Sequence, residues 1–236
     1  MSSEPLTRGR ALAEVVMCSG FPTQLAIIAA LRVAGIQVKP DGTLSAQFIF
    51  AVSAIDTVLL LGLIFLFLRL SHDRARDVFL GSQPIGTEVR LGIVLVPILF
   101  MAVVLLQLVV RLIAPALHNV DINPFIALLA SPWLLAGFIL LVLIAGGLRE
   151  ELQRAFLLHR FEQRLGGGRV GLAVTSLAFG LGHTLQGWDA AIVTAMLGAC
   201  WGAIYLTRRS VVATVVSHAF FNVAQVAVGY AALARA

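Results

Sequence analysis

Charged residues are scarce in this chain of 236 residues: only 12% are Asp, Glu, Lys or Arg, whereas 59% are hydrophobic and the mean hydropathy is +0.96. An ordinary soluble domain has about 25% charged and about 45–50% apolar residues. A water-exposed globule of this composition would lack the polar side chains needed to cover its surface. The composition therefore excludes a soluble domain and predicts an integral membrane protein.

Cysteine and lysine are rarer still. The two cysteines, Cys18 and Cys200, lie in apolar segments without a C-x-x-C or Cys/His pattern, which argues against a disulfide framework and a thiolate metal site. Sixteen of the seventeen cations are arginines, and most of them lie singly or in pairs at the ends of apolar runs. This distribution is typical of membrane topology signals, so we expect no nucleic-acid partner.

Long apolar runs are what the chain has in abundance. Runs of more than twenty residues favour membrane-spanning helices over the roughly 10-residue alternating strands of a barrel. The expected fold is all-α, a polytopic transmembrane helical bundle of about seven spans (six to eight) that forms a single domain over residues 1–236. The candidate spans are residues 13–35, 47–70, 91–113, 133–158, 170–186, 188–206 and 210–233.

The arginines also predict an orientation. If the chain alternates across the membrane from a cytoplasmic N-terminus, eleven cations lie inside and four outside. The excess of inside cations supports an N-terminus inside and a C-terminus outside. We expect a multi-pass protein of a bacterial inner membrane, surrounded by the lipid bilayer. The sequence does not indicate the oligomeric state.

Four charged residues fall inside the fourth candidate span: Arg149, Glu150, Glu151 and Arg154. A charge at the bilayer centre costs roughly 2.5–3.5 kcal/mol on insertion scales, so this cluster requires a protein-lined cavity. Alternatively, the span ends near Leu148 and the charged stretch is a surface helix. Both interpretations remain open at this point.

Ionisable groups on three spans lie at compatible depths. At 1.5 Å per residue, Glu150 is roughly 15 Å, His218 roughly 13 Å and His183 roughly 21 Å from the inner surface. Phe179 lies one turn before His183, and Asn222 one turn after His218, so each pair shares a helix face. Because each buried polar group needs partners, we expect these groups to converge on one site.

Other polar and small residues have simpler expected roles. Arg154 follows Glu150 by four residues, the favourable order for an ion pair that holds one glutamate charged while the other stays free for chemistry. Asp56 and Asp189 are expected to be helix-packing or helix-end residues. The G-x-x-x-G at 198–202 predicts close packing of the sixth span against a neighbour.

Three ordered motifs resemble those of a known family. The stretches Gly147–Phe156 (GLREELQRAF), Ser176–His183 (SLAFGLGH) and His218–Asn222 (HAFFN) are similar to the signature motifs of the CPBP family, which includes type II CAAX prenyl endopeptidases and bacteriocin-processing, Abi-like proteins. The family pattern is Glu-Glu-x-x-x-Arg, Phe-x-x-x-His and His-x-x-x-Asn. The resemblance covers about residues 125–230, which we expect to be the catalytic region.

The first motif departs from the family spacing by one residue. The arginine is Arg154, whereas the family position after two matched glutamates is Ala155. Matching both glutamates requires one residue deleted within a helix, which turns the following residues by about 100°. A gapless match instead sets Arg149 at the first glutamate and Glu150 at the second.

The resemblance implies peptide-bond hydrolysis inside the membrane, near its cytoplasmic side, on a membrane-anchored or hydrophobic peptide or protein. It implies that Glu150 is the general base and that Glu151 supports it or binds the substrate backbone. His183 would hold the water or a metal, and His218 with Asn222 would stabilise the oxyanion. Arg154 and Phe179 are the supporting residues of the same motifs.

A metal is left open by the sequence. His183, His218 and Glu150 are ligand types of a catalytic zinc, although no H-E-x-x-H is present. A metal-free mechanism with glutamate-activated water uses the same residues. Possible Zn²⁺ and no metal are therefore both compatible with these residues.

Two other functions compete with the endopeptidase. One is a non-catalytic membrane protein of the same fold that binds peptides or confers immunity, and the other is a small transporter whose Glu/His cluster relays protons. The presence of all five motif residues favours an enzyme. Transporters usually have paired inverted halves with broken helices, whereas the polar residues here lie in the C-terminal half. The sequence does not identify the substrate or whether it is prenylated.

Overall fold

The computed structural model describes residues 6–36, 38, 44–120 and 123–235, and every regular element among them is a helix. The predicted all-α fold is therefore confirmed. The main helices are α1 (Arg8–Met17), α2 (Phe21–Val33), α3 (Ala46–Leu70), α4 (Ala75–Phe79), α5 (Ile85–Ile113), α6 (Pro132–Leu141), α7 (Glu150–Arg164), α8 (Gly168–Leu181), α9 (Trp188–Arg208) and α10 (Val212–Leu233). A π-helical segment, η3 (Val142–Arg149), joins α6 to α7, and 3₁₀ turns cover Pro115–Leu117, Ile126–Leu129 and Thr184–Gln186.

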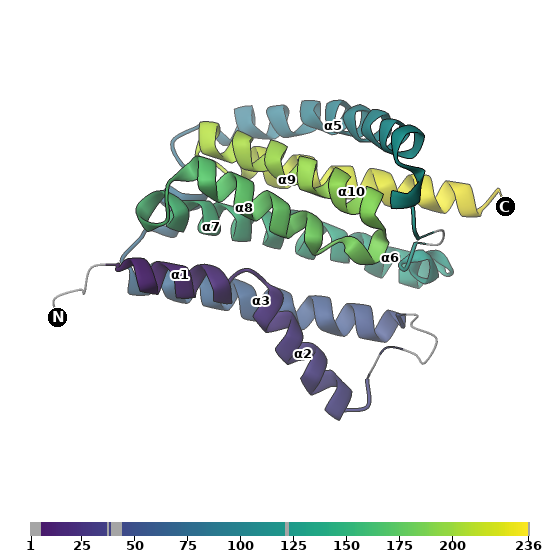
Figure 1. Ribbon diagram of the computed structural model, residues 1–236, viewed down its shortest axis with the longest axis horizontal. Helices are drawn as coiled ribbons and strands as arrows, with labels where there is room; N and C mark the ends of the chain where they lie inside the picture. Colours follow the sequence, from purple (N-terminus) through teal and green to yellow (C-terminus); the bar gives the residue numbers. More distant parts are fainter. Residues whose placement is uncertain (1–5, 37, 39–43, 121–122, 236) are drawn as a thin grey trace.

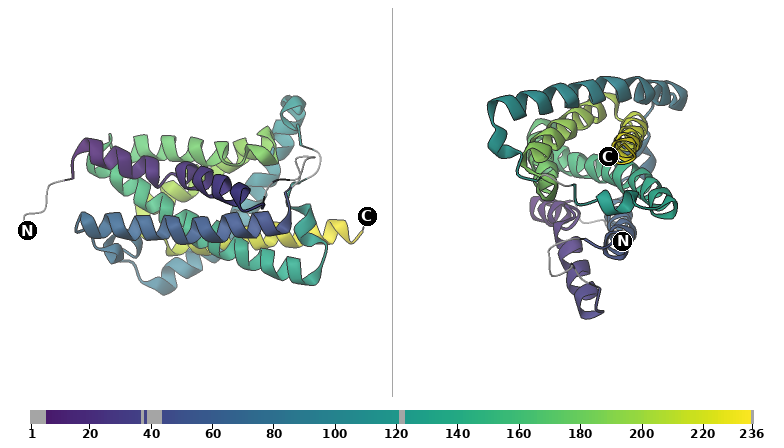
Figure 2. Two further views of the ribbon diagram at one scale, coloured as in Figure 1. Left: turned by 90° about the horizontal axis from the view of Figure 1, so that it is seen from below. Right: turned by 90° about the vertical axis from the view of Figure 1, so that its right-hand side faces the viewer.

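The helices lie side by side along one long axis (Figure 1). Helices α1 to α3 form one side, α6 to α8 lie in the middle, and α5, α9 and α10 form the other side. Helix α5 crosses α9 and α10 obliquely (Figure 2). Helix α10 packs against both α5 and η3, and α8 packs against α9, so the regions that carry the three motifs are neighbours.

In the described residues, five helical segments are long and apolar enough to cross a membrane: Ala46–Leu70, Ile85–Ile113, Pro132–Arg164, Trp188–Arg208 and Val212–Leu233. Helices α1 and α2 together make a sixth, bent by 43°, and the apolar helix α8 has only 14 residues. These segments correspond to the seven predicted spans, and the chain is a multi-pass integral membrane protein. The predicted fourth span, residues 133–158, continues as a helix to Arg164.

Two predicted spans are shorter or broken for local reasons. The first is interrupted at Gly20, whose φ of 91° is readily adopted only by glycine, and Pro22 then starts α2. The segment predicted as 170–186 is helical only to Leu181, where Gly182 and a 3₁₀ turn follow. Hydropathy averaged over a span-length window does not detect either change because the adjoining helical stretches are apolar.

Close approach of α8 and α9 depends on the predicted G-x-x-x-G. A Cβ at Gly198 would lie 3.0 Å from the Phe179 ring, and one at Gly202 would lie 2.5 Å from Leu172. Both neighbours belong to α8, so the predicted packing role of the two glycines is confirmed.

A buried ionic network joins the helices at the arginine-rich end of the bundle. Arg160 on α7 is fully buried and donates to Glu14 on α1 at 2.6 Å and to Asp73 after α3 at 2.5 Å. Its Nη2 donates to the Phe67 carbonyl and to the Ser71 hydroxyl, both at 3.2 Å. This one side chain therefore ties α1 and α3 to α7.

Candidate functional site

The helix that carries the first motif is continuous through the charged residues. The helix Pro132–Arg164 continues past Leu148, and its residues from Glu151 to Phe156 are buried inside the bundle, so the surface-helix alternative is wrong. Its π segment, Val142–Arg149, ends directly before Glu150, and π turns are frequent at functional sites. Arg149, Glu151 and Arg154 are buried, as the cavity interpretation predicts.

Two glycines in the π segment let α10 approach the first motif. A Cβ on Gly146 would lie 2.6 Å from Nδ2 of Asn222, and one on Gly147 would lie 2.6 Å from Cβ and 2.9 Å from Cα of Ala219. Both distances are shorter than a real carbon contact allows. Glycine at these positions therefore brings the third motif against the first.

The two glycines give a matched pair of variants. Gly146→Ala meets only the end of the Asn222 side chain, so we expect kcat to fall by about tenfold or more with the free energy of unfolding changed by less than about 1 kcal/mol. Gly147→Ala meets the α10 backbone and is expected to destabilise the fold by about 1–3 kcal/mol. Turnover assays and chemical denaturation in detergent measure kcat and the free energy of unfolding of both variants. Equal destabilisation of the two variants with unchanged turnover would contradict the placement of Asn222 in the functional site.

Glu151 is the more deeply buried of the two glutamates, at 1% exposure. Arg154 donates to its carboxylate through Nε at 3.3 Å and through Nη2 at 3.2 Å. Arg154 also lies over the Phe179 ring, at 4.4 Å from the centroid. The predicted pairing of Arg154 with Glu150 is wrong, because the regular α7 helix brings Arg154 to Glu151 at the i, i+3 spacing.

His218 lies between the two glutamates. Its Nδ1 is 2.9 Å from Oε1 of Glu151, and its Nε2 is 3.7 Å from Oε2 of Glu150. Trp201 stacks on the imidazole at 3.8 Å between centroids, and the indole N–H donates to Ser217 at 2.8 Å. The ring of His218 is thus held on its edge by a carboxylate and on its face by an indole.

His183 follows the end of α8 and is held by its own helix. Its Nδ1 is 2.7 Å from the carbonyl oxygen of Phe179, which can only accept, so Nδ1 carries the proton. The imidazole also packs against the Phe179 ring at 4.7 Å. In the neutral ring, Nε2 is then a free acceptor. The pairing of these two residues on one face agrees with their i, i+4 spacing.

Four of the predicted site residues, Glu150, His183, His218 and Asn222, line one cavity of about 910 Å³ together with Phe179. They come from the start of α7, the end of α8 and the middle of α10. Glu151 and Arg154 do not line this cavity and lie behind His218 and Phe179. The three motifs therefore converge, with Glu150 as the carboxylate exposed to the cavity.

The cavity does not fit a three-ligand metal site. Within the described ranges, no group of three His, Cys, Asp or Glu side chains is close enough to hold a metal ion. A catalytic zinc needs three such ligands and an open position. In the described part of the chain, Glu150, His183 and His218 do not lie close enough together to meet this requirement.

Arg149 forms an ionic connection beside Glu150 that was not predicted from the sequence. Nη2 of Arg149 is 3.4 Å from Asp56 on α3 and 3.8 Å from Glu150, and Nη1 donates to Gln153 at 3.2 Å. Asp56 in turn accepts from Thr23 on α2 at 2.6 Å. Asp56 thus joins helices as expected, but its contact with the first motif was not predicted. The sequence signal for this contact was that Asp56 and Arg149 are opposite charges inside two predicted spans, where each needs a partner.

Comparison with known proteins bears on the same region. Residues 131–224 match the family model described as type II CAAX prenyl endopeptidase Rce1-like. No curated protein and no solved structure matched the chain. The matched range includes all three motifs and most of α6 to α10, and it excludes α1 to α5. Over residues 131–224, this chain is therefore similar to the Rce1-like type II CAAX prenyl endopeptidases, a protease family, which agrees with the predicted CPBP resemblance.

Proposed function

We propose that this protein is an intramembrane endopeptidase that hydrolyses a peptide bond of a membrane-anchored or hydrophobic peptide with water activated by a glutamate. The observation that carries the proposal is the convergence of Glu150, His183, His218 and Asn222 on one cavity inside the bundle. The match of the same region to a protease family supports hydrolysis over proton transport.

Glu150 is our candidate for the general base. Its side chain is 17% exposed and faces the cavity, whereas the Glu151 carboxylate is fully engaged by Arg154 and His218. Within the described part of the chain, the nearest ionic partners of Glu150 are His218 at 3.7 Å and Arg149 at 3.8 Å. A carboxylate that borders a cavity without a close partner can take a proton from water.

His183 is our candidate for positioning that water. Because its Nδ1–H donates to the Phe179 carbonyl, its Nε2 can accept a hydrogen from a water molecule in the cavity. One hydrogen of the water would point to Glu150 and the other to His183. The lone pair of the water oxygen would then face the scissile carbonyl carbon, as attack requires.

His218, as the imidazolium ion, and Asn222 are our candidates for stabilising the oxyanion. The Glu151 carboxylate accepts the Nδ1–H of His218, so Nε2 has a hydrogen to donate only in this doubly protonated form. Asn222 lies one turn after His218, and both line the cavity next to Glu150. Donors fixed before the reaction stabilise the negative charge that develops on the carbonyl oxygen. Glu151 and Arg154 act as positioning residues, since Glu151 holds Nδ1 of His218 and thereby directs Nε2 toward Glu150.

The reaction then completes without another component. The water oxygen bonds to the carbonyl carbon as its proton passes to Glu150. Collapse of the tetrahedral intermediate breaks the C–N bond, and Glu150 returns the proton to the leaving amine. The products are a carboxylic acid and an amine, and Glu150 is again ionised.

Asp56 is expected to influence Glu150 through Arg149. Asp56→Asn removes the charge that holds Arg149 at 3.4 Å, so Arg149 can bind Glu150 and compete for the base. We expect kcat to fall by about tenfold, equivalent to about 1.4 kcal/mol, with little change in KM. Steady-state kinetics test this. An unchanged kcat in a folded Asp56→Asn protein would show that Arg149 does not control the base.

The proposal is tested by incubating the purified protein in bilayers with a library of membrane-anchored peptides. Fragments are identified by mass spectrometry, and zinc is quantified in the same preparations. Specific cleavage supports the endopeptidase. Peptide binding without cleavage across the library would favour the alternative, a non-catalytic binding or immunity protein of the same fold.

A further inference from the structure

The cavity that contains Glu150 is closed at one end of the bundle and extends toward the other. On α10 its lining begins at His218 and continues to Leu233, the last residue of the helix. On α5 the lining runs from Phe100 to Arg111, near the C-terminal end. On α9 it runs from Trp201 back to Asp189, the second residue of the helix. The lining residues on α10, α5 and α9 all extend toward the same end of the bundle.

Among the residues that the structure describes, none from the opposite end lines this cavity. Beyond Trp201 and His218 the interior is filled by the buried Glu151–Arg154 pair and by Phe156, which is 0% exposed. A peptide therefore has no open path from that end to Glu150. The fifteen helical steps from His218 to Leu233 correspond to a path of about 22 Å along the cavity.

The closed end is the arginine-rich end. The α7–α8 turn with Arg164 and Arg169, the α9–α10 turn with Arg208 and Arg209, and the start of α1 lie together at one end of the molecule, and the C-terminus lies at the other (Figure 1). The excess of arginines marks the first of these ends as cytoplasmic. The cavity accordingly opens on the extracytoplasmic side.

The mouth is built from ordered polar contacts. Asp189, 4% exposed, pairs with Nδ1 of His118 at 2.7 Å and lies 3.8 Å from Nε of Arg111. The Asn119 side chain accepts the backbone N–H of Trp188 at 3.0 Å. These contacts fasten the segment after α5 to the start of α9. The opening therefore has a polar rim, and most residues that line the passage below it are apolar.

We propose that the substrate is a hydrophobic polypeptide segment presented on the extracytoplasmic side of the membrane, which enters past Arg111 and Asp189 and reaches Glu150 in extended form. A path of about 22 Å holds about six or seven extended residues. This inference rests on the proposed function and differs from the cytoplasmic-side cleavage that the family resemblance implies. Hydrolysis occurs closer to the cytoplasmic surface, but access is from outside.

The first test is a measurement of access that does not require activity. Cys18 and Cys200 are replaced by alanine, and a single cysteine is placed at Gln225, an exposed residue in the cavity lining, or at the exposed Arg169 as a matched control. A charged, membrane-impermeant thiol reagent is applied to right-side-out or to inverted vesicles. We expect Gln225→Cys to react in right-side-out vesicles and Arg169→Cys in inverted vesicles, at least about tenfold faster than in the other orientation. Reaction of Gln225→Cys from the cytoplasmic side would overturn the inference.

The second test uses cleavage. A peptide with a bulky soluble tag, which cannot cross the bilayer, is anchored to the outer leaflet of right-side-out or of inverted vesicles, and detergent-solubilised protein supplies the reference. Cleavage in right-side-out vesicles alone supports the inference, and cleavage in inverted vesicles alone contradicts it while the proposed function survives. If no cleavage occurs even in detergent, the proposed function fails, and the thiol labelling still decides which end is open.

Discussion

Replacing Glu150 by glutamine is expected to lower kcat by about 10³-fold or more while the protein remains folded. The amide keeps the size of the carboxylate but cannot take a proton from water, and general bases contribute about 10²–10⁴-fold to such reactions. Glu150 borders the cavity, and its ion pairs with other described residues are long, at 3.7 Å to His218 and 3.8 Å to Arg149, so the loss of its charge breaks no close ion pair among them. Turnover of a cleavable peptide in bilayers, measured beside thermal unfolding, tests the expectation.

Two matched variants make this result specific. Glu162→Gln changes another α7 glutamate, which pairs with Arg209 near the surface outside the cavity, and it should leave turnover unchanged. Glu151→Gln should reduce both turnover and stability, because the buried carboxylate binds Arg154 and His218. If Glu150→Gln turns over peptide at the wild-type rate, Glu150 is not the base.

Replacing Arg160 by methionine is expected to destabilise the fold by about 3–5 kcal/mol, the usual cost of removing one partner from a buried ion pair. Arg160 is 0% exposed, and its loss would leave Glu14, at 2% exposure, without its partner at 2.6 Å. Of its ionic partners among the described residues, Glu14 would retain Arg10, whose side chain is 33% exposed. Chemical denaturation in detergent, with limited proteolysis of α1, measures the effect.

A surface pair and a compensated variant serve as controls. Arg209→Gln removes the half-exposed partner of Glu162 and should cost less than about 1 kcal/mol. Adding Glu14→Gln and Asp73→Asn to Arg160→Met removes the two carboxylates that lost Arg160 as a partner and should recover part of the lost stability. An Arg160→Met protein as stable as the wild type would contradict the role of this network.

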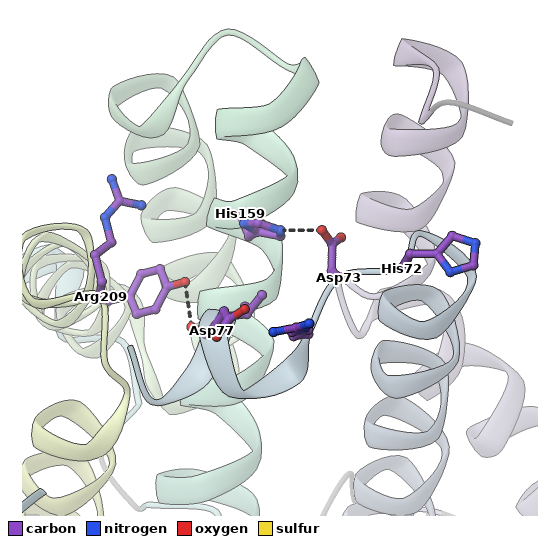
Figure 3. Close-up of a pocket in the computed structure, with 8 residues that line it drawn as sticks. His72, Asp73, Asp77, His159 and Arg209 are labelled. Carbon is purple, nitrogen blue, oxygen red and sulfur yellow. Dashed lines mark hydrogen bonds and ion pairs between the residues drawn. The ribbon is translucent and has the colours of Figure 1, made fainter. Parts of the chain in front are cut away.

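The same network predicts a pH dependence at the acidic end. Burial alone raises the pKa of the Asp73 carboxyl, but the hydrogen bond from Arg160 and the charges of His159 and Arg160 outweigh burial and hold this pKa below its usual value. Asp73 faces His159 at 3.4 Å beside a small cavity lined by His72, Asp77 and Arg209 (Figure 3). Because the folded-state pKa is lowered, the contribution of Asp73 to stability is present above its unfolded pKa and is lost as the pH falls through the folded value. Asp73→Asn should remove this component of the denaturation profile.

The sequence was sufficient to predict the fold class and the convergence of the motifs. Apolar runs of span length leave little choice but helices, and charged groups in a bilayer must find one another. The shared depth of Glu150, His183 and His218 followed from helical rise alone. Their meeting in one cavity agrees with that arithmetic.

The partners of individual charges could not be predicted from spacing. Arg154 has glutamates at both i−4 and i−3, and the choice of Glu151 depends on Phe179 and His218, which belong to other helices. The contact between Arg149 and Asp56 likewise joins residues far apart in the chain. Such choices depend on packing between helices, which a single helix pattern does not contain.

Backbone irregularities were also missed. The π segment Val142–Arg149 and the break at Gly20 lie in stretches whose hydropathy resembles that of a regular span. The two glycines 146 and 147 were the local signal for close packing, since a Cβ at either would meet α10. Their effect depends on a neighbour that only the three-dimensional arrangement identifies.

The central claim is that water, activated in the cavity of Glu150, hydrolyses a peptide bond. The most direct measurement is cleavage of a membrane-anchored peptide by the wild-type protein in bilayers prepared in water enriched in ¹⁸O, with mass spectrometry of both fragments. We expect two complementary fragments, with one ¹⁸O in the new carboxylate, and no fragments from the Glu150→Gln protein. Peptides that remain intact, or equal cleavage by both proteins, would contradict the claim.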